Sequence, residues 1–219
     1  MIGTLVIFFD IDKDKIINYS LSFSSGVLLS ISIFDLLFES IKMFNKNYRI
    51  IISIIIFTLF FLVGLLITFF INKRIDKNDN IYKIGLLSLI GIMIHNIPEG
   101  MLTYISFKIN SRLGINIAVA IAMHNIPEGI SIAVPIFYST NNKLKAIIYT
   151  LISSLSEPLG ALISLIFLKY VINNTFLGIL LSLVSGIMIY ISYIEFKSSK
   201  TNILLFFTGI IFILLNLML

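Results

Sequence analysis

The feature that most constrains this chain is a hexapeptide that occurs twice inside long apolar segments. The first copy is His95–Gly100 (HNIPEG), and an identical copy, His124–Gly129, begins 29 residues later. The two copies contain both histidines of the protein and two of its four prolines. Because a polar or ionisable group inside an apolar membrane segment is costly without a partner, the repeat predicts a binding function rather than packing alone.

The composition indicates a protein that lies in a lipid bilayer. Of the 219 residues, 58% are hydrophobic and 12% are charged, and the mean hydropathy is +1.04, whereas a soluble domain has about 25% charged residues. We therefore predict a polytopic membrane protein in which residues 1–219 form a single transmembrane domain. The lack of cysteine excludes a disulfide framework and a thiolate metal site. The net charge of +5 is spread over short loops, which indicates membrane topology rather than nucleic-acid binding.

Hydropathy predicts seven full membrane-spanning helices. Crossing about 30 Å of hydrocarbon takes about 20 apolar residues. Seven segments are long enough, namely 19–41, 50–71, 84–107, 113–138, 146–169, 176–194 and 203–219. Residues 1–9 are apolar but too short, and we interpret them as part of a truncated first helix; the alternative is a short interfacial segment. The expected fold is an all-α integral membrane bundle of eight helices with the first truncated.

The positions of lysine and arginine predict how the chain is oriented. Of its 16 Lys and Arg residues, ten lie in the loops that follow the first, third, fifth and seventh spans. Cytoplasmic loops of membrane proteins are enriched in these residues. We therefore expect these loops in the cytoplasm and both termini outside, in a multi-pass protein of the cytoplasmic membrane.

The two hexapeptides are expected to face each other near the middle of the membrane. Each lies close to the centre of its span, and the short loop between the spans makes the two helices antiparallel. His95 and Glu99 are four residues apart, as are His124 and Glu128, so each pair shares one helix face. Two imidazoles and two carboxylates should therefore meet at one depth.

Three further polar side chains are expected at the same level. Asn96 and Asn125 each precede the glutamate of their motif by three residues and lie on an adjoining strip of the helix. Glu157 lies in a Ser-Glu-Pro insertion at the centre of the span 146–169. The proline of each motif and the one after Glu157 free backbone carbonyls inside the helices, which is tolerated where protein, water or a ligand meets them.

The kinds of side chain in this set predict the kind of ligand. Imidazole, carboxylate and amide oxygen without thiolate suit borderline divalent ions: Zn²⁺, Fe²⁺, Mn²⁺, Co²⁺ or Cd²⁺. A mixed site of this kind can replace the hydration of an ion and still release it. Any one of these residues alone would more often be structural, since a membrane histidine commonly bonds a neighbouring helix and a proline commonly marks a kink. Their coincidence at one depth favours a bound and transported ion, with no enzymatic cofactor.

Three other carboxylates are candidates for the route of the ion. Asp35 and Glu39 are four residues apart near the expected outer end of the span 19–41, where they could collect cations at an entrance. Glu195 lies at the inner end of the span 176–194 and is a candidate for the exit. The alternative for all three is an ordinary interfacial carboxylate, since a charge near a helix end reaches water at low cost.

The motifs resemble those of the ZIP family of divalent metal transporters, and most of all its bacterial zinc-uptake branch of the ZupT and GufA type. The resemblance extends from Ser25 to the last span and is most specific at residues 95–100, 124–129, 156–161 and 185–190. It implies an eight-helix bundle with both termini outside and a mid-membrane centre for one or two metal ions. The ligands that it implies are His95, Asn96, Glu99, His124, Asn125, Glu128 and Glu157.

The chain also departs from this family in two respects. Most of the first helix is missing relative to family members, and many relatives outside the branch have a glutamate in place of Asn125 and a His-Glu pair in place of Glu128-Gly129. The resemblance therefore does not fix the metal preference. The expected partners are divalent metal ions and the lipid bilayer, and a homodimer is left open.

Two functions are compatible with these residues. The first is a permease that moves divalent metal ions, zinc above all, into the cell. The second is an intramembrane zinc-dependent hydrolase, because His-x-x-x-Glu resembles a rearranged zinc-hydrolase helix with a glutamate base. The repeated ligand set on two helices favours the permease, since catalysis needs one open zinc and one base, and the sequence offers no oxyanion donors or nucleophile. We therefore expect a transporter and no enzyme.

Overall fold

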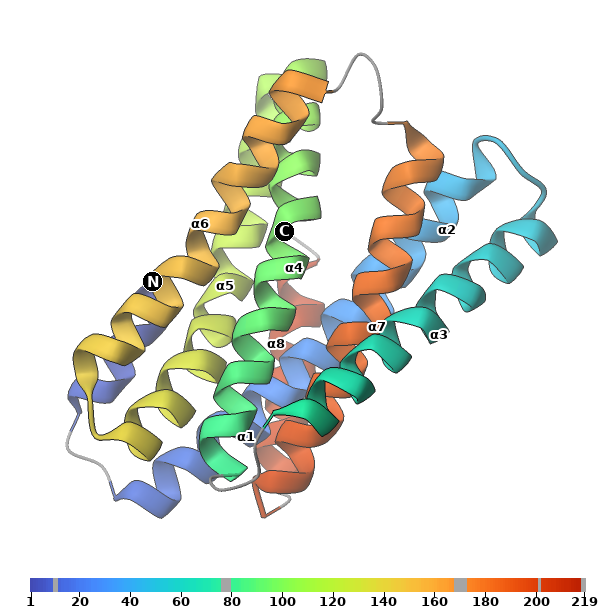
Figure 1. Cartoon of the computed structure of the whole chain (residues 1–219). Coiled ribbons are helices and arrows are strands. Elements are labelled where there is room, and N and C mark those ends of the chain that lie inside the picture. Colours follow the sequence, from blue (N-terminus) through green and yellow to red (C-terminus); the bar gives the residue numbers. More distant parts are fainter. Residues whose placement is uncertain (10–11, 76–79, 168–172, 201, 218–219) are drawn as a thin grey trace.

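The computed structural model describes residues 1–9, 12–75, 80–167, 173–200 and 202–217, which form helices and no strand (Figure 1). The elements in chain order are a 3-10 helix η1 (Ile2–Phe8), α1 (Lys13–Ser30), a π-helical segment η2 (Ile31–Leu37), α2 (Phe38–Asn45), α3 (Ile50–Arg74), α4 (Asn80–Ile109), α5 (Ser111–Thr140), α6 (Lys143–Phe167), α7 (Asn174–Ser198) and α8 (Ile203–Asn216). The segments α1, η2 and α2 follow one another without a break and form one long helix.

Six of these helices are long and apolar enough to cross a membrane. They are the continuous helix Lys13–Asn45 and each of α3 to α7, while α8 is a shorter apolar helix of 14 residues. The connections of α3 to α4, α5 to α6 and α7 to α8 lie at one end of the bundle, and those of α4 to α5 and α6 to α7 lie at the other (Figure 1). The prediction of an all-helical membrane bundle is confirmed. Residues 168–169 and 218–219 of the expected spans lie outside the described residues.

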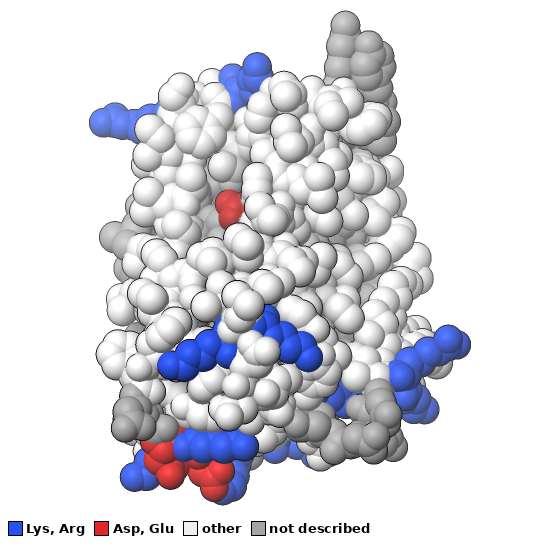
Figure 2. All heavy atoms as spheres, turned by 60° about the vertical axis from the view of Figure 1, so that its left-hand side comes forward, with Lys and Arg blue, Asp and Glu red and all other residues white. Residues whose placement is uncertain are grey.

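The surface of the bundle fits a lipid environment. Figure 2 shows the Lys, Arg, Asp and Glu side chains gathered mostly toward the lower end of the molecule, with few at the upper end. The broad wall between the two ends is uncharged except for one acidic side chain that is visible in a hollow. An uncharged band between charged ends is what a multi-pass protein presents to hydrocarbon and headgroups.

Glycine pairs bring three pairs of helices into backbone contact. In each pair, a glycine from either helix lies against a backbone carbonyl of the other, and a Cβ added at either glycine would overlap that carbonyl oxygen. The pairs are Gly26 with Gly209 (α1 and α8), Gly64 with Gly186 (α3 and α7), and Gly100 with Gly160 (α4 and α6). Membrane helices associate through such close packing, because lipid offers no hydrophobic drive for it.

The close contacts divide the bundle into two groups of helices. The α4 group contains η1, α4, α5 and α6; beside the α4–α6 pair, Gly3 of η1 lies against the backbone of α5. The α7 group contains α1, η2, α2, α3, α7 and α8. Hydroxyl groups join its members, since the Ser32 Oγ donates to the Ser185 carbonyl (2.6 Å) and the Ser192 Oγ donates to the Ser25 carbonyl (2.8 Å).

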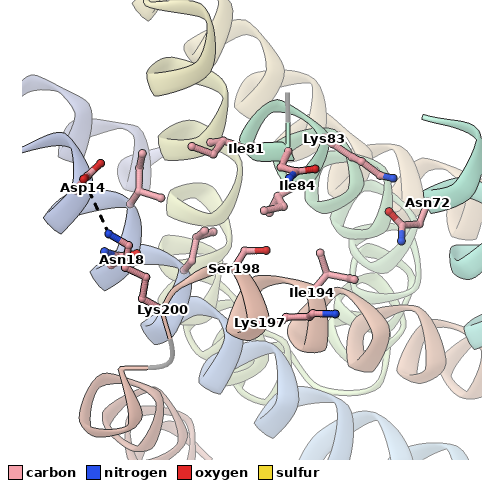
Figure 3. Close-up of a pocket in the computed structure, with 13 residues that line it drawn as sticks. Asp14, Asn18, Asn72, Ile81, Lys83, Ile84, Ile194, Lys197, Ser198 and Lys200 are labelled. Carbon is pink, nitrogen blue, oxygen red and sulfur yellow. Dashed lines mark ion pairs between the residues drawn. The ribbon is translucent and has the colours of Figure 1, made fainter. Parts of the chain in front are cut away.

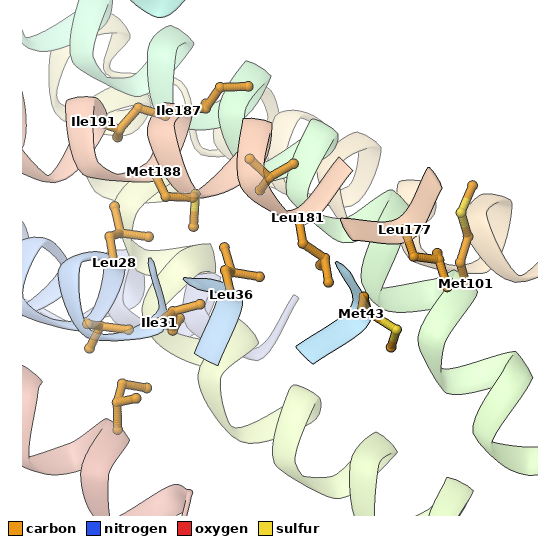
Figure 4. Packing of buried hydrophobic residues seen from close by; sticks show 13 residues of the cluster. Leu28, Ile31, Leu36, Met43, Met101, Leu177, Leu181, Ile187, Met188 and Ile191 are labelled. Atoms are coloured by element: carbon orange, nitrogen blue, oxygen red, sulfur yellow. The ribbon is translucent and has the colours of Figure 1, made fainter. Parts of the chain in front are cut away.

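Two apolar clusters fill the interior. The first is the core of the α7 group, where Leu28 and Ile31 pack with Leu36 and with Met188 of α7, and where Met101 of α4 also reaches (Figure 4). The second cluster joins buried residues of η1, α1, α4, α5 and α6 and therefore lies across the boundary between the groups. Apolar packing of this kind holds the two groups of helices together.

The glycines that end the two hexapeptides have different surroundings, which gives a test of the packing. A Cβ at Gly100 would overlap the Glu157 carbonyl, whereas a Cβ at Gly129 meets no atom closer than 3.4 Å. We expect Gly100→Ala to destabilise the protein by about 1–3 kcal/mol through overpacking. Gly129→Ala should leave stability unchanged or raise it slightly, because alanine favours the helix by about 1 kcal/mol.

The measurement is thermal unfolding of both variants in the same detergent. The matched pair removes the effect of helix propensity, since both glycines lie inside helices and end the same hexapeptide. Equal melting temperatures for Gly100→Ala and the unchanged protein would contradict the backbone contact between α4 and α6.

Candidate metal centre

The two hexapeptides lie halfway along α4 and α5, inside helices that continue through both prolines. A single residue separates the two helices, because Asn110 ends α4 and caps α5: its Oδ1 accepts the backbone N–H of Arg112 (2.8 Å). The tight turn makes the helices antiparallel, so residues near their midpoints lie at the same level. His95 and Glu128 are both almost completely buried.

The imidazoles and carboxylates of the two motifs lie together between α4 and α5. The His95 Nε2 is 3.1 Å from Glu99 Oε1 and 3.3 Å from Glu128 Oε1. The His124 Nε2 is 2.7 Å from the same Glu99 oxygen. One ligand atom from each of His95, His124 and Glu128 can be chosen so that all three lie within 4.8 Å of one another, which is a spacing that could hold a metal ion.

Many polar atoms of this cluster have no hydrogen-bond partner among the described residues. The Nδ1 of His95, the Oε2 of Glu128 and the Oε2 of Glu99 are buried in this state. Described Lys and Arg side chains form no ion pair with these carboxylates. Buried polar atoms are normally satisfied, and unpaired buried charges are costly. The set can therefore donate electron pairs to a cation, which would satisfy the atoms and balance the negative charge.

The asparagines and Glu157 extend the cluster toward α6. The Asn96 Nδ2 donates to the Ser153 carbonyl (3.2 Å), and the Asn125 Nδ2 donates to Glu157 Oε2 (3.0 Å). Both amides therefore use their N–H groups and keep their Oδ1 atoms, which are buried and unpaired. A cavity of about 10 Å³ between α4, α5 and α6 is lined by Asn96, Asn125 and Glu128, among others. Its volume suits a single water molecule or ion.

The two carboxylates proposed for an entrance lie in different surroundings. Asp35 is in the π-helical segment η2, is half-buried, and interacts electrostatically with His124, Glu99 and His95. Glu39 forms an ion pair with Lys42 (3.1 Å) and is therefore already neutralised at the rim. The charge of Asp35 therefore acts on the cluster, while that of Glu39 is paired with Lys42.

Glu195 lies in surroundings that the sequence did not indicate. The alternative interpretation of Glu195, an ordinary interfacial carboxylate that reaches water, does not fit, because this side chain is completely buried. Its Oε2 accepts the hydroxyl of Ser24 (2.6 Å), and its Oε1 accepts the hydroxyl of Ser88 (2.7 Å) and that of Ser131. The negative charge of Glu128 in the cluster also repels that of Glu195.

The three serines around Glu195 are polar residues that sequence reasoning missed. Ser24, Ser88 and Ser131 belong to α1, α4 and α5, and each is buried. A serine in an apolar helix is common at ordinary helix contacts, and this chain has many buried serines. The sequence therefore held no signal that separates these three serines from the others, because the burial of Glu195 is known only from the structure.

Comparison with known proteins agrees with the geometry. Residues 72–216 match the family model described as ZIP Zinc transporter. The chain is 36% identical over 211 residues to the zinc transporter ZupT of Streptococcus mutans, which covers 89% of this chain and 80% of that protein. It is 33% identical over 201 residues to ZupT of Chlorobium chlorochromatii, covering 83% and 75%.

A third relative matches more strongly over a shorter stretch. ZupT of Clostridium perfringens is 48% identical over 124 residues, which is 57% of this chain and 44% of that protein. The family match covers α4 to α8 and includes both hexapeptides and Glu157. With the helical membrane bundle and the buried His/Glu cluster, these similarities show that the chain belongs to the ZIP zinc transporter family.

Proposed function

We propose that this protein moves divalent metal ions, zinc above all, across the cytoplasmic membrane into the cell. The observation that carries the proposal is the buried cluster of His95, Glu99, His124 and Glu128 halfway through the bundle, in which the His95 Nδ1 and one oxygen of each carboxylate have no hydrogen-bond partner among the described residues. Nitrogen and oxygen ligands without sulfur suit zinc and similar ions. Two carboxylates balance the charge of one dication in a region where a free charge is costly, and Glu157 adds a third negative charge.

The transported ion would be held by residues from three helices. His95 and Glu99 of α4 and His124 and Glu128 of α5 would supply the central ligands. The unpaired Oδ1 atoms of the two asparagines and the carboxylate of Glu157 would add neutral and charged oxygens on the side of α6. This arrangement offers positions for a second ion beside the first. Because imidazole and carboxylate ligands recur on neighbouring residues, an ion can exchange one ligand for the next in steps. This favours transport over permanent binding.

The candidate route runs along the boundary between the two groups of helices. Asp35 would draw a cation toward His124 from the outer side, and Glu195 would receive it on the inner side, close to Glu128. A shift of one group of helices against the other would open the two sides in turn. The excess of Lys and Arg in the loops at the α3–α4 and α5–α6 end supports a cytoplasmic location for that end, and both termini outside.

A transporter is favoured over a hydrolase. The proteins that the chain resembles are named transporters, and the two motifs provide equivalent ligand sets instead of one zinc site and one separate base. The proposed role of the bound metal is therefore that of a passing substrate.

Replacing central ligands should abolish metal uptake. In proteoliposomes or zinc-starved cells, we expect His95→Ala and Glu128→Ala each to lower zinc uptake by more than about tenfold, since even groups that only support metal ligands change affinity by roughly 10–100-fold. The control is Ser164→Ala in α6, whose buried hydroxyl has no partner among the described residues. Normal uptake in both site variants would refute the proposal, as would labelled-peptide cleavage without ion flux.

Zinc binding should stabilise the fold independently of transport. A ligand at 100 times its dissociation constant adds about 2.7 kcal/mol to the free energy of unfolding, so zinc should raise the melting temperature in detergent and a chelator should reverse the rise. The double variant Glu99→Gln/Glu128→Gln should lose this zinc-dependent rise. Mg²⁺ should give little effect, because it keeps its water and prefers oxygen ligands. An undiminished rise in the double variant would place the bound zinc elsewhere.

Asp35 and Glu39 should differ in their effect on uptake, although they lie four residues apart. Asp35 interacts with the imidazoles of the cluster, while Glu39 is paired with Lys42. We expect Asp35→Asn to lower the initial uptake rate by about three- to tenfold at low ionic strength, through lost steering. Glu39→Gln should change it by less than about twofold, as for an exposed ion pair. Equal effects of the two substitutions would argue against an entrance at Asp35.

A further inference from the structure

Glu195 and its three serines form a polar contact among four helices in an otherwise apolar region. The carboxyl group is completely buried, and its two oxygens divide the donors: Oε2 accepts from Ser24, while Oε1 accepts from Ser88 and Ser131. Nearby, Ile17 and Leu21 belong to the apolar cluster that crosses the boundary between the groups. A hydrogen-bonded contact inside such packing is directional, whereas the packing around it is not.

The two oxygens of Glu195 face different groups of helices. Glu195 lies on α7 and Ser24 on α1, so the bond to Oε2 stays within the α7 group. Ser88 lies on α4 and Ser131 on α5, so both bonds to Oε1 cross to the α4 group. A relative movement of the two groups therefore breaks the two bonds to Oε1 and leaves the bond to Oε2 intact.

Another hydrogen bond between the groups lies on the opposite side of the metal centre. The Asn216 Nδ2 of α8 donates to the carbonyl of Ala120 in α5 (3.1 Å). Ala120 precedes His124 along α5, and Ser131 follows it. The bonds to Glu195 thus link the two groups of helices on the Ser131 side of the cluster.

A cavity lies next to these hydrogen bonds, on the side that faces away from the metal centre. It has a volume of about 570 Å³, and its walls come from α1, α3, α4 and α7, so both groups contribute (Figure 3). Leu21, Ile84 and Ile194 line it, and they lie three, four and one residues from Ser24, Ser88 and Glu195 respectively. Figure 3 also shows the Asp14–Lys200 ion pair on one side and Lys83 beside Asn72 on the other. The cavity shape depends on how the two groups are placed, since each supplies part of its wall.

We propose that the bonds from Ser88 and Ser131 to Glu195 are an interlock that holds the two groups of helices in the arrangement seen here, with the cavity open. Ser88 and Ser131 are then positioning residues, because they act through Glu195. The inference rests on the proposed function, in which a metal ion passes from Glu128 toward Glu195. An ion bound at Oε1 displaces both hydroxyls together, so its arrival there releases the tie between the groups.

The test uses the absence of tryptophan from the chain. Asn18 lines the cavity and is half-buried, so Asn18→Trp introduces a single reporter whose emission iodide can quench when the cavity is open. The background protein, reconstituted in lipid nanodiscs with a chelator, is compared with the same protein containing Ser88→Ala/Ser131→Ala. Ser24→Ala is the matched control, because it removes a donor to the same carboxyl group without removing a link between the groups.

The constant for iodide quenching of the tryptophan should be lower in the double variant by about twofold or more. The reason is that each hydrogen bond to a charged group shifts a two-state population by roughly tenfold, here toward the arrangement with the cavity open. Ser24→Ala should stay close to the background protein. Zinc should lower the quenching constant of the background protein and should not lower that of the double variant any further. Single Ser88→Ala and Ser131→Ala variants, expected to give intermediate values, replace the double variant if it does not elute as a monodisperse species.

Quenching that is unchanged in the serine variants, or changed as much by Ser24→Ala, would overturn the interlock. An equal zinc effect with and without Ser88 and Ser131 would overturn the displacement of their hydroxyls by the ion. Zinc uptake by the background protein is measured separately. Loss of uptake there, with the quenching pattern intact, would count against the proposed transport function and leave the interlock standing.

Discussion

The structure depends on the burial of carboxylates and imidazoles at one level inside an apolar bundle. Glu99 and Glu128 are almost completely buried, and no described Lys or Arg side chain forms an ion pair with them. In a membrane interior such a pair of acids is costly, and a bound dication offsets that cost directly. The bundle must therefore be rigid enough to keep the ligands in place and must also allow the ion to leave.

The rigidity comes from helix contacts that involve backbone atoms. Gly100 directly follows Glu99, and the carbonyl of Glu157 fills the space where a larger residue would place its Cβ. The same contact brings Ser153 to Asn96, whose amide it accepts. His95 and Glu99 are thus each positioned by α6 through the residue that follows them, so that the spacing of the helices also sets the spacing of these two side chains.

Local sequence patterns predicted most of this fold and the meeting of the two motifs. Long apolar segments define membrane helices, and the four-residue spacing of His95 and Glu99 puts both on one face regardless of the neighbouring helix. What could not be predicted depends on contacts between distant segments. The burial of Glu195 depends on serines of three other helices, and a π-helical segment around Asp35 interrupts the α-helical hydrogen bonding of a long helix. Neither leaves a local pattern that differs from ordinary helix sequence.

The two identical hexapeptides lie in different surroundings and therefore make different contacts. His95 lies beside both Glu99 and Glu128, while His124 makes its close contact with Glu99 alone. The first copy is in backbone contact with α6 at Gly100, whereas the second copy is in backbone contact with η1, where Gly3 lies against the carbonyl of Ile126. The two motifs are chemically equal, yet a different neighbouring helix holds each of them. A displacement of η1 would therefore change the geometry of the second motif without directly changing that of the first.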